Sequence, residues 1–389
     1  MTRPSHILPI IIFSQFSGTS LWFSGNAIVS DLQQNWGLPA NSVGYVTSAV
    51  QFGFIVGTLI FSYLALADRF SPSKLFFICS VIAATTNAAL LVAPEGMTSL
   101  LLLRFLTGFF LAGIYPVGMK IAASWYEQGL GRALGYLVGA LVLGTAFPHL
   151  IKSLGVAIPW QQVIAAVSIV AIFGGILLRM LVPDGPFLPK GSPFNTRVLP
   201  VIFRSKKFRA SALGYFGHMW ELYTLWAFIP LFLLAYTTQS NQSVNISFWS
   251  FITIAVGFIG CAVGGLMSEK LGSARVASTQ LLISGACCIL SPFFFLAEWP
   301  IFIIFMLIWG VTVIGDSPQL SALTAQNAPR EYVGSALAIV NSMGFLITVL
   351  SIGLTSWLLP VIGVQYIFWL LIPGPVLGLL ALQPIREDG

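Results

Sequence analysis

Twelve stretches of about 20 apolar residues divide this chain, and no other feature restricts its fold so strongly. They are centred near Gly18, Phe54, Ala84, Phe110, Leu143, Ala171, Leu222, Gly257, Cys287, Gly310, Phe345 and Phe368. About 20 apolar residues are what a helix needs to cross the hydrocarbon core of a bilayer. Charged residues make up only 8% of the chain, against roughly 25% in a soluble domain. We therefore predict an all-α membrane protein with twelve transmembrane helices.

Basic residues gather on one side of the predicted membrane. If the N-terminus is cytoplasmic, all 18 Lys and Arg residues except Lys152 and Arg104 fall in cytoplasmic loops or at cytoplasmic helix ends. The opposite loops carry Asp31, Glu95 and Glu298. By the positive-inside rule, we expect a multi-pass protein of the bacterial inner (cytoplasmic) membrane with both termini in the cytoplasm. The net charge of +6 therefore indicates topology, and no soluble basic face remains for nucleic acid.

A polar stretch rich in Pro, Gly and basic residues separates the first six apolar stretches from the last six. It predicts an N-terminal six-helix bundle over residues 1–182, a cytoplasmic linker over 183–209 and a C-terminal six-helix bundle over 210–389. Three signals recur about 200 residues apart, as an internal duplication requires. The pairs are Asp68-Arg69 with Glu269-Lys270, Tyr115-Pro116 with Ser317-Pro318, and Gly131 to Leu134 with Gly334 to Leu337. We therefore predict two six-helix pseudo-repeats.

The loop after the second span of each half carries a charged motif. The later copy contains Gly265, Glu269, Lys270, Gly272 and Arg275; the earlier one keeps Asp68, Arg69 and Lys74 but has Leu64 and Ser71 at the glycine positions. In this motif, GxxxD(R/K)xGxx(R/K), the chain resembles the major facilitator superfamily over essentially its whole length. A family-like RxxxG also occurs as Arg104 and Gly108. The resemblance implies the fold of that family and a gating role for the charged residues of both loops.

Ionisable side chains that lie inside predicted spans include Arg104, His218, Glu221 and Asp316. A charge in hydrocarbon is costly unless it meets a partner or water, so such residues mark pathways and binding sites. The resemblance implies that the first, fourth, seventh and tenth spans line a central cavity, and these four residues fall on three of those spans. We predict proton coupling, with Glu221 and Asp316 as proton carriers, His218 as a modulator and Arg104 as a counter-charge for substrate or carboxylate.

Other interpretations of these four residues stay open. Asp316 precedes Ser317-Pro318, so its carboxylate could bond backbone groups that the proline frees. Glu221 could be neutralised permanently by His218 or Arg104, since His218 lies one turn away on the same helix face. Arg104 could extend to the outer membrane surface.

Aromatic and amide side chains on the same predicted cavity spans are candidates for binding the substrate. They are Gln15, Trp22, Asn26, Tyr115, Trp220, Tyr223, Trp226 and Trp309. The aromatic rings could stack on a planar or partly apolar solute. Helix packing and interfacial belts use the same residues, so this assignment competes with a purely structural one.

These features favour a proton-coupled secondary transporter that imports a small organic solute by alternating access. An efflux antiporter for drugs or metabolites is the alternative, although the fifth span lacks the complete GxxxGPxxGG of such antiporters. A transport-inactive sensor on the same fold is a remoter one. Because HExxH, GxSxG and GxxxxGK[ST] are all absent, the sequence indicates neither an enzyme nor an ATP-driven pump. We expect a monomer with no cofactor and no metal.

Overall fold

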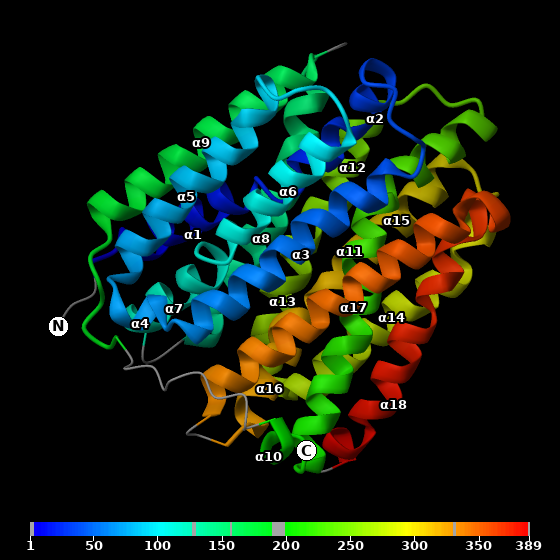
Figure 1. Cartoon of the computed structure of the whole chain (residues 1–389). Coiled ribbons are helices and arrows are strands. Elements are labelled where there is room, and N and C mark those ends of the chain that lie inside the picture. Colours follow the sequence, from blue (N-terminus) through cyan, green and yellow to red (C-terminus); the bar gives the residue numbers. More distant parts are fainter. Residues whose placement is uncertain (1–3, 127–129, 156–157, 189–198, 330–331, 388–389) are drawn as a thin grey trace. The chain divides into compact units, whose positions relative to one another are not determined.

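The computed structural model describes residues 4–126, 130–155, 158–188, 199–329 and 332–387, and the regular elements there are all helices (Figure 1). Twelve helical segments in this part of the chain are long and apolar enough to cross a membrane. They coincide with the twelve apolar stretches, so the predicted all-α membrane fold is confirmed. Arg3, Lys190, Arg197 and Arg330, which contributed to the predicted orientation, lie outside the described residues.

The chain divides into two compact units, Met1–Phe194 and Asn195–Gly389. The division falls inside the predicted linker, of which residues 189–198 lie outside the described part. Helix α10 (Leu199–Ile202) and the start of α11 (Lys206–Gln239) occupy the rest of its second half. The seventh span therefore begins before Ala210, because the Ser205 hydroxyl accepts the Phe208 N–H and caps the helix earlier.

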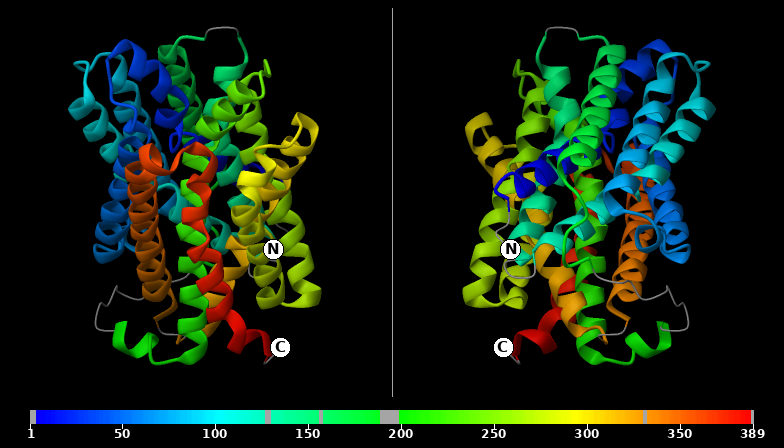
Figure 2. Two further views of the ribbon diagram at one scale, coloured as in Figure 1. Left: turned by 90° about the vertical axis from the view of Figure 1, so that its right-hand side faces the viewer. Right: turned by 90° about the vertical axis from the view of Figure 1, so that its left-hand side faces the viewer.

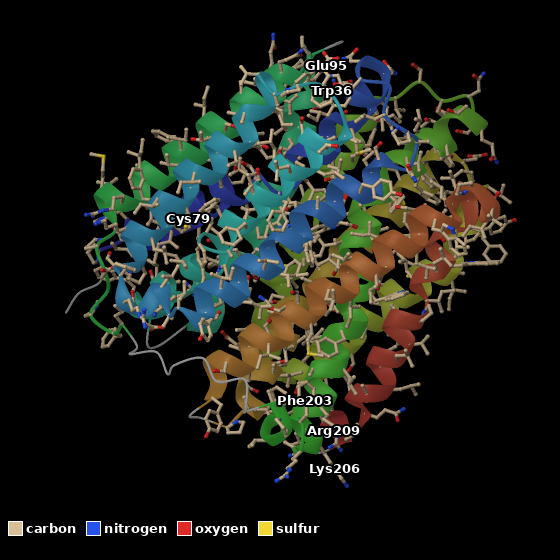
Figure 3. All side chains as sticks on the ribbon, in the orientation of Figure 1. Trp36, Cys79, Glu95, Phe203, Lys206 and Arg209 are labelled. Carbon is tan, nitrogen blue, oxygen red and sulfur yellow. The ribbon has the colours of Figure 1, made fainter. Side chains whose placement is uncertain are left out.

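The described residues of the first unit form six spans, several of them assembled from two helices. In chain order they are α1 (Ile7–Thr19) with α2 (Ser24–Asn35), α3 (Ser42–Tyr63), α5 (Pro72–Ala88) with the 3₁₀ turn η1 (Ala89–Leu91), α6 (Met97–Leu111) with α7 (Tyr115–Trp125), α8 (Leu130–Ser153) and α9 (Trp160–Leu181). The short helix α4 (Leu66–Arg69) lies in the loop after α3. Figure 2 shows these helices running alongside one another, and Figure 3 shows Trp36 and Glu95 at the same end of the unit.

Helices α3 and α6 approach each other at backbone distance. A Cβ atom added at Gly53 would lie 2.0 Å from the Phe105 carbonyl oxygen, and one at Gly108 would lie 2.0 Å from the Val50 carbonyl oxygen. Small residues allow such close packing between membrane helices. The glycine of the RxxxG pattern thus brings α6 against α3.

The second unit repeats this arrangement. Its spans are α11, α12 (Ile246–Ala255) with α13 (Gly257–Leu271), α14 (Ser273–Phe294), α15 (Trp299–Gly315) with α16 (Ser317–Asn327), α17 (Val333–Ile362), and the 3₁₀ segment η4 (Val364–Leu371) with α18 (Pro373–Glu387). Helix α11 packs against α16, α17 and α18. Lys206 and Arg209 project from the first turns of α11 at one end of the unit (Figure 3).

The fourth and tenth spans break at matching positions. Helix α7 begins at Tyr115 and α16 at Ser317, so Pro116 and Pro318 each occupy the second position of a new helix. Proline has no N–H to donate and is tolerated at a helix start but disruptive inside one. The duplicated prolines therefore explain both breaks. One of them places Asp316 between two helices in the interior of the second unit.

Candidate functional site

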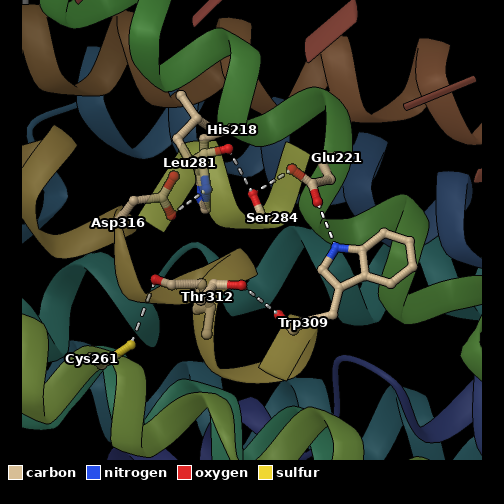
Figure 4. A network of polar contacts seen from close by, with 9 residues as sticks. His218, Glu221, Cys261, Leu281, Ser284, Trp309, Thr312 and Asp316 are labelled. Carbon is tan, nitrogen blue, oxygen red and sulfur yellow. Dashed lines mark hydrogen bonds and ion pairs between the residues drawn. The ribbon is translucent and has the colours of Figure 1, made fainter. Parts of the chain in front are cut away.

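Glu221 lies near the middle of the 34-residue helix α11 and is only 1% exposed. Its Oε1 accepts a hydrogen bond from the Trp309 indole N–H at 2.7 Å and from the Cys288 thiol at 3.4 Å. The Ser284 hydroxyl donates to Oε2 at 3.0 Å. Figure 4 shows the carboxyl group directed at Trp309 and Ser284. Three helices, α11, α14 and α15, therefore meet at one carboxyl group.

All three donors to Glu221 are uncharged. A buried carboxylate without a cation is costly in its ionised form, and hydrogen bonds from neutral donors recover part of that cost. The group can therefore lose or gain a proton without breaking an ion pair. This is the chemistry that a proton carrier inside a membrane protein needs.

A pair of titratable groups, His218 and Asp316, lies near Glu221, since His218 is one turn before it on α11. His218 Nδ1 lies 2.8 Å from Asp316 Oδ1, and both side chains are buried (Figure 4). Asp316 precedes α16, but its side chain makes no capping hydrogen bond to that helix. The carboxyl group thus faces the imidazole across the bundle, while the N–H groups of Asp316 and Ser317 lie close enough to influence it.

The structure bears on one of the open alternatives, the neutralisation of Glu221 by His218. His218 follows the helical spacing to Glu221, yet it pairs with Asp316. Glu221 is held by neutral donors of the second unit. His218 does not neutralise it among the described contacts of this unit.

Arg104 forms the corresponding cluster of the first unit and is completely buried. Its Nη1 donates to Ser24 Oγ at 2.9 Å and to Asn87 Oδ1 at 3.0 Å. Its Nη2 donates to the carbonyl oxygens of Leu21 and Trp22, at 3.0 and 2.5 Å. Arg104 therefore does not extend to the membrane surface, and its hydrogen-bond partners among the described residues include no carboxylate.

The acceptors of Arg104 lie where the first span is interrupted. Helix α1 ends at Thr19 and α2 begins at Ser24, which leaves the carbonyls of Leu21 and Trp22 outside regular helix. Asn87 extends the cluster, because its Nδ2 donates to Ser168 Oγ of α9 at 3.0 Å. The guanidinium thus ties α6 to the interruption, and Asn87 joins α5 and α9 to it.

The residues predicted to bind substrate separate into several groups. Trp309 binds Glu221, and the half-buried Trp220 donates to the Leu370 carbonyl of η4 at 2.9 Å. The rings of Tyr223 and Trp226 pack edge to face, with centroids 5.3 Å apart. In the first unit, Trp22 lies against Phe54 and Tyr115, Asn26 donates to Thr47, and Gln15 is fully buried.

The two copies of the charged loop differ. In the first unit Lys120 of α7 forms an ion pair with Asp68 and donates to the Ala67 carbonyl at 2.7 Å. Arg69 and Lys74 are exposed. In the second unit Glu269, Lys270 and Arg275 are exposed, and within the part of the chain described Glu269 has no ion-pair partner.

Sequence reasoning missed several members of these clusters. Asn87 is an amide inside an apolar span, which is itself a signal of an inward-facing position. Lys120 lies within the fourth span, but the sequence analysis uses it only as one of the basic residues that indicate membrane orientation. Ser24, Ser284 and Cys288 carry no such signal, because small polar residues are common throughout the spans.

Comparison with known proteins agrees with this architecture. The family model described as Major Facilitator Superfamily matches residues 10–315 and 211–388. The MFS-type transporter YcaD of Escherichia fergusonii is 25% identical over 297 residues, which are 72% of this chain and 71% of that protein. The niacin transporter NiaP of Acinetobacter baylyi is 24% identical over 326 residues, which are 73% of this chain and 70% of that protein. The YcaD protein of Salmonella heidelberg aligns over 66% of its length.

Two solved structures share the fold. The proton:xylose symporter XylE superposes with a TM-score of 0.75 over 98% of this chain and 96% of its own, at 14% identity. The nucleoside transporter NupG superposes with a TM-score of 0.71 over 97% of this chain and 99% of its own, also at 14% identity. With the family model covering both six-helix halves, this chain belongs to the major facilitator superfamily and is a multi-pass secondary transporter for a small-molecule substrate, not an enzyme.

Proposed function

We propose that this transporter couples the movement of a small organic solute to protons, with Glu221 as the principal proton carrier. The observation that carries the proposal is a fully buried carboxyl group held by three neutral donors from two neighbouring spans. We place the protein in the bacterial inner membrane as a monomer, with both termini in the cytoplasm.

Alternating access supplies the reason for protonation. Secondary transporters of this architecture expose a midplane site to one side at a time. When water reaches Glu221, ionisation costs little; when the site closes, the neutral form is favoured. Closure is therefore easier with a proton bound, which links proton transfer to the conformational change.

The His218–Asp316 pair completes the proposed coupling machinery. The pair has the same net charge whether the proton rests on the imidazole or on the carboxyl group. It can release a proton toward Glu221, one turn from His218, and then return to its original net charge by taking up another proton from water. His218 accordingly modulates the carrier and Asp316 acts as a second one.

The relatives support a small organic cargo. NiaP is named for niacin, XylE for xylose and NupG for nucleosides. We propose uptake as the direction. Efflux by antiport is the alternative, and the sign of the proton movement distinguishes the two.

The test is solute-driven proton movement in proteoliposomes that contain a pH-sensitive dye. Ligands are first found by a thermal-shift screen of a metabolite library at two pH values. We expect an inward solute gradient to acidify the lumen in a symporter, and Glu221→Gln to abolish the acidification while solute still exchanges. Glu95→Gln, which changes an exposed carboxylate, is the matched control.

Two results would contradict the proposal. Undiminished proton movement in Glu221→Gln would remove Glu221 from the coupling step. If inward solute movement made the lumen more alkaline, protons would leave as the solute enters. Coupling would then hold, but the mechanism would be antiport and not the symport expected for uptake.

A further inference from the structure

Two glutamines lie near the buried carboxyl groups of the second unit. Gln319 of α16 is 2% exposed, and Gln280 of α14 is half-buried. The Oε1 atom of each is shielded from solvent and accepts no hydrogen bond from the residues that the structure describes. Leaving a buried acceptor unsatisfied is costly, and most such groups in proteins find a partner, either another protein group or ordered water. Two of them side by side indicate a place for water.

Each amide lies one turn from a residue of the proposed coupling machinery. Gln280 precedes Ser284 by four residues on α14, and Ser284 donates to Glu221. Gln319 follows Asp316 by three residues at the start of α16. Residues three or four apart share a helix face. The two amides are therefore the next polar groups after the two carboxyl groups along these helix faces.

The two amides meet at Gly264 of α13. A Cβ atom added at Gly264 would lie 2.7 Å from Gln280 Nε2 and 3.2 Å from Gln319 Nε2. The same atom would lie 3.2 Å from the Gly315 carbonyl oxygen. Two amide groups and a backbone carbonyl thus surround one point, where they offer donors and acceptors together. The amides can approach α13 this closely because Gly264 has no side chain.

The Gln280 amide also contacts the break between α15 and α16. A Cβ atom added at Gly315 would lie 1.7 Å from Gln280 Oε1, so the amide oxygen takes the place of a side chain there. Gly315 is the last residue of α15 and immediately precedes Asp316. The interruption that holds the Asp316 carboxyl group is therefore in contact with the amide.

The amides lie between the carboxyl groups and one end of the unit. At a rise of about 1.5 Å per residue, Gln280 is about 10 Å from the start of α14 and Gln319 about 12 Å from the end of α16. Ser284 and Asp316 are each one turn deeper. The order of the spans puts the start of α14 and the end of α16 on the same side of the membrane, the cytoplasmic side in the proposed topology.

We propose that Gln280 and Gln319 bind water at Gly264, and that this water passes protons between the cytoplasmic side and the carboxyl groups of Asp316 and Glu221. A buried water needs roughly two to four polar partners, which the two amides and the nearby carbonyl supply. Each water accepts a proton on one side and releases one on the other, while the amides keep their own protons. This inference rests on the proposed proton coupling and adds the residues beside which the proton enters or leaves.

The test compares leucine and serine substitutions in proteoliposomes that contain the pH-sensitive dye. Leucine is close to glutamine in size but excludes water, whereas serine is small and polar and leaves room for it. We expect Gln280→Leu and Gln319→Leu each to slow solute-driven proton movement at least tenfold. Solute exchange should stay close to that of the parent chain, because exchange requires no proton release. Gln161→Leu, at an exposed position of α9, is the control and should change neither rate.

Serine variants separate water binding from packing. If the amides hold water, Gln280→Ser and Gln319→Ser should move protons clearly faster than the leucine variants. If the amides only fill space, serine leaves the larger cavity and should be the more damaging substitution. Serine variants as slow as the leucine variants, or equal losses of solute exchange and proton movement, would show that the amides are structural.

A third variant changes the same place from α13. Gly264→Ala puts a Cβ atom 2.7 Å from Gln280 Nε2, so the flexible amide has to move away. We expect slower proton movement with a melting temperature close to that of the parent chain. Gly353→Ala of α17 is the control, because its added Cβ atom would meet nothing within 4 Å. Proton movement at the parental rate in Gly264→Ala and both leucine variants would overturn the passage.

The proposed coupling and the proposed passage fail in different ways. If the parent chain moves no protons with its solute, the coupling is wrong and the passage falls with it. If the parent chain moves protons and Glu221→Gln abolishes the movement, but both leucine variants match the parent chain, the coupling stands and only the passage is wrong.

Discussion

Each half of the molecule has a buried polar cluster where its first, third and fourth spans meet, but the two clusters have opposite chemistry. In the first unit, Arg104 is surrounded by neutral acceptors from α5 and the interruption of the first span. In the second unit, Glu221 is surrounded by neutral donors from α14 and α15. The duplication thus preserved the place of the cluster while its charge was reversed.

The difference assigns different tasks to the halves. A guanidinium does not lose its proton in proteins, so the Arg104 cluster has one charge state and one bonding pattern. A carboxyl group can change its charge state, so the Glu221 cluster has two. We infer that the first unit contributes a permanent joint and the second unit a proton-dependent one.

The largest expected effect comes from breaking the permanent joint. Arg104→Leu removes four hydrogen bonds from a buried cluster in which the Ser24 hydroxyl is the other donor, at 2.7 Å to Asn87 Oδ1 and 3.0 Å to the Leu21 carbonyl. The loss should lower stability by on the order of 3 kcal/mol or more. We expect a large fall in the melting temperature of the purified protein. Arg179→Gln, at an exposed position in the last turn of α9, is the control.

Stability is the informative quantity in that comparison. Glu221→Gln keeps an oxygen for the Trp309 N–H, so its melting temperature should stay close to that of the parent chain. If Arg104→Leu were as stable as the parent but defective in proton coupling, the assignment of tasks to the two halves would be reversed.

A smaller effect sharpens the description of the proton-dependent cluster. Trp309→Phe removes the shortest hydrogen bond to Glu221 and keeps most of the ring packing. The lost donor stabilises the ionised carboxylate more than the neutral form, by about 1.4 kcal/mol, which corresponds to about one pH unit. Because the neutral form then persists to higher pH, the midpoint of the pH dependence of transport should rise by about that amount.

That midpoint is measured as proton-driven solute uptake over a series of external pH values. Trp226 packs edge to face on Tyr223 and lies on the same helix as Glu221, but its indole N–H does not bond to Glu221. Trp226→Phe is therefore the comparison. A midpoint that moves equally in both variants would reflect aromatic packing and not the hydrogen bond to Glu221.

The sequence predicted the spans and repeats of the molecule better than the partners of its buried polar residues. Apolar length is a property of each span alone, so twelve spans and two repeats could be derived without tertiary information. The partners of Glu221 depend on which faces of three spans meet. Helical spacing made His218 a possible partner of Glu221, whereas packing between spans placed His218 against Asp316. The Asn87 amide is the exception, because an amide in an apolar span is visible in the sequence.

The smallest expected effect concerns the two charged loops, where the halves also differ. Asp68 pairs with Lys120, whereas Glu269 has no ion-pair partner in the described part of its unit. Partly exposed ion pairs contribute about 0–1 kcal/mol, so Asp68→Asn should lower stability only slightly and Glu269→Gln not at all. A double-mutant cycle of Asp68→Asn with Lys120→Met, read from melting temperatures, isolates the pair. If transport in Asp68→Asn falls far more than its small loss of stability explains, the first loop acts in gating; if Glu269→Gln reduces transport equally, gating does not depend on the ion pair that distinguishes the two loops.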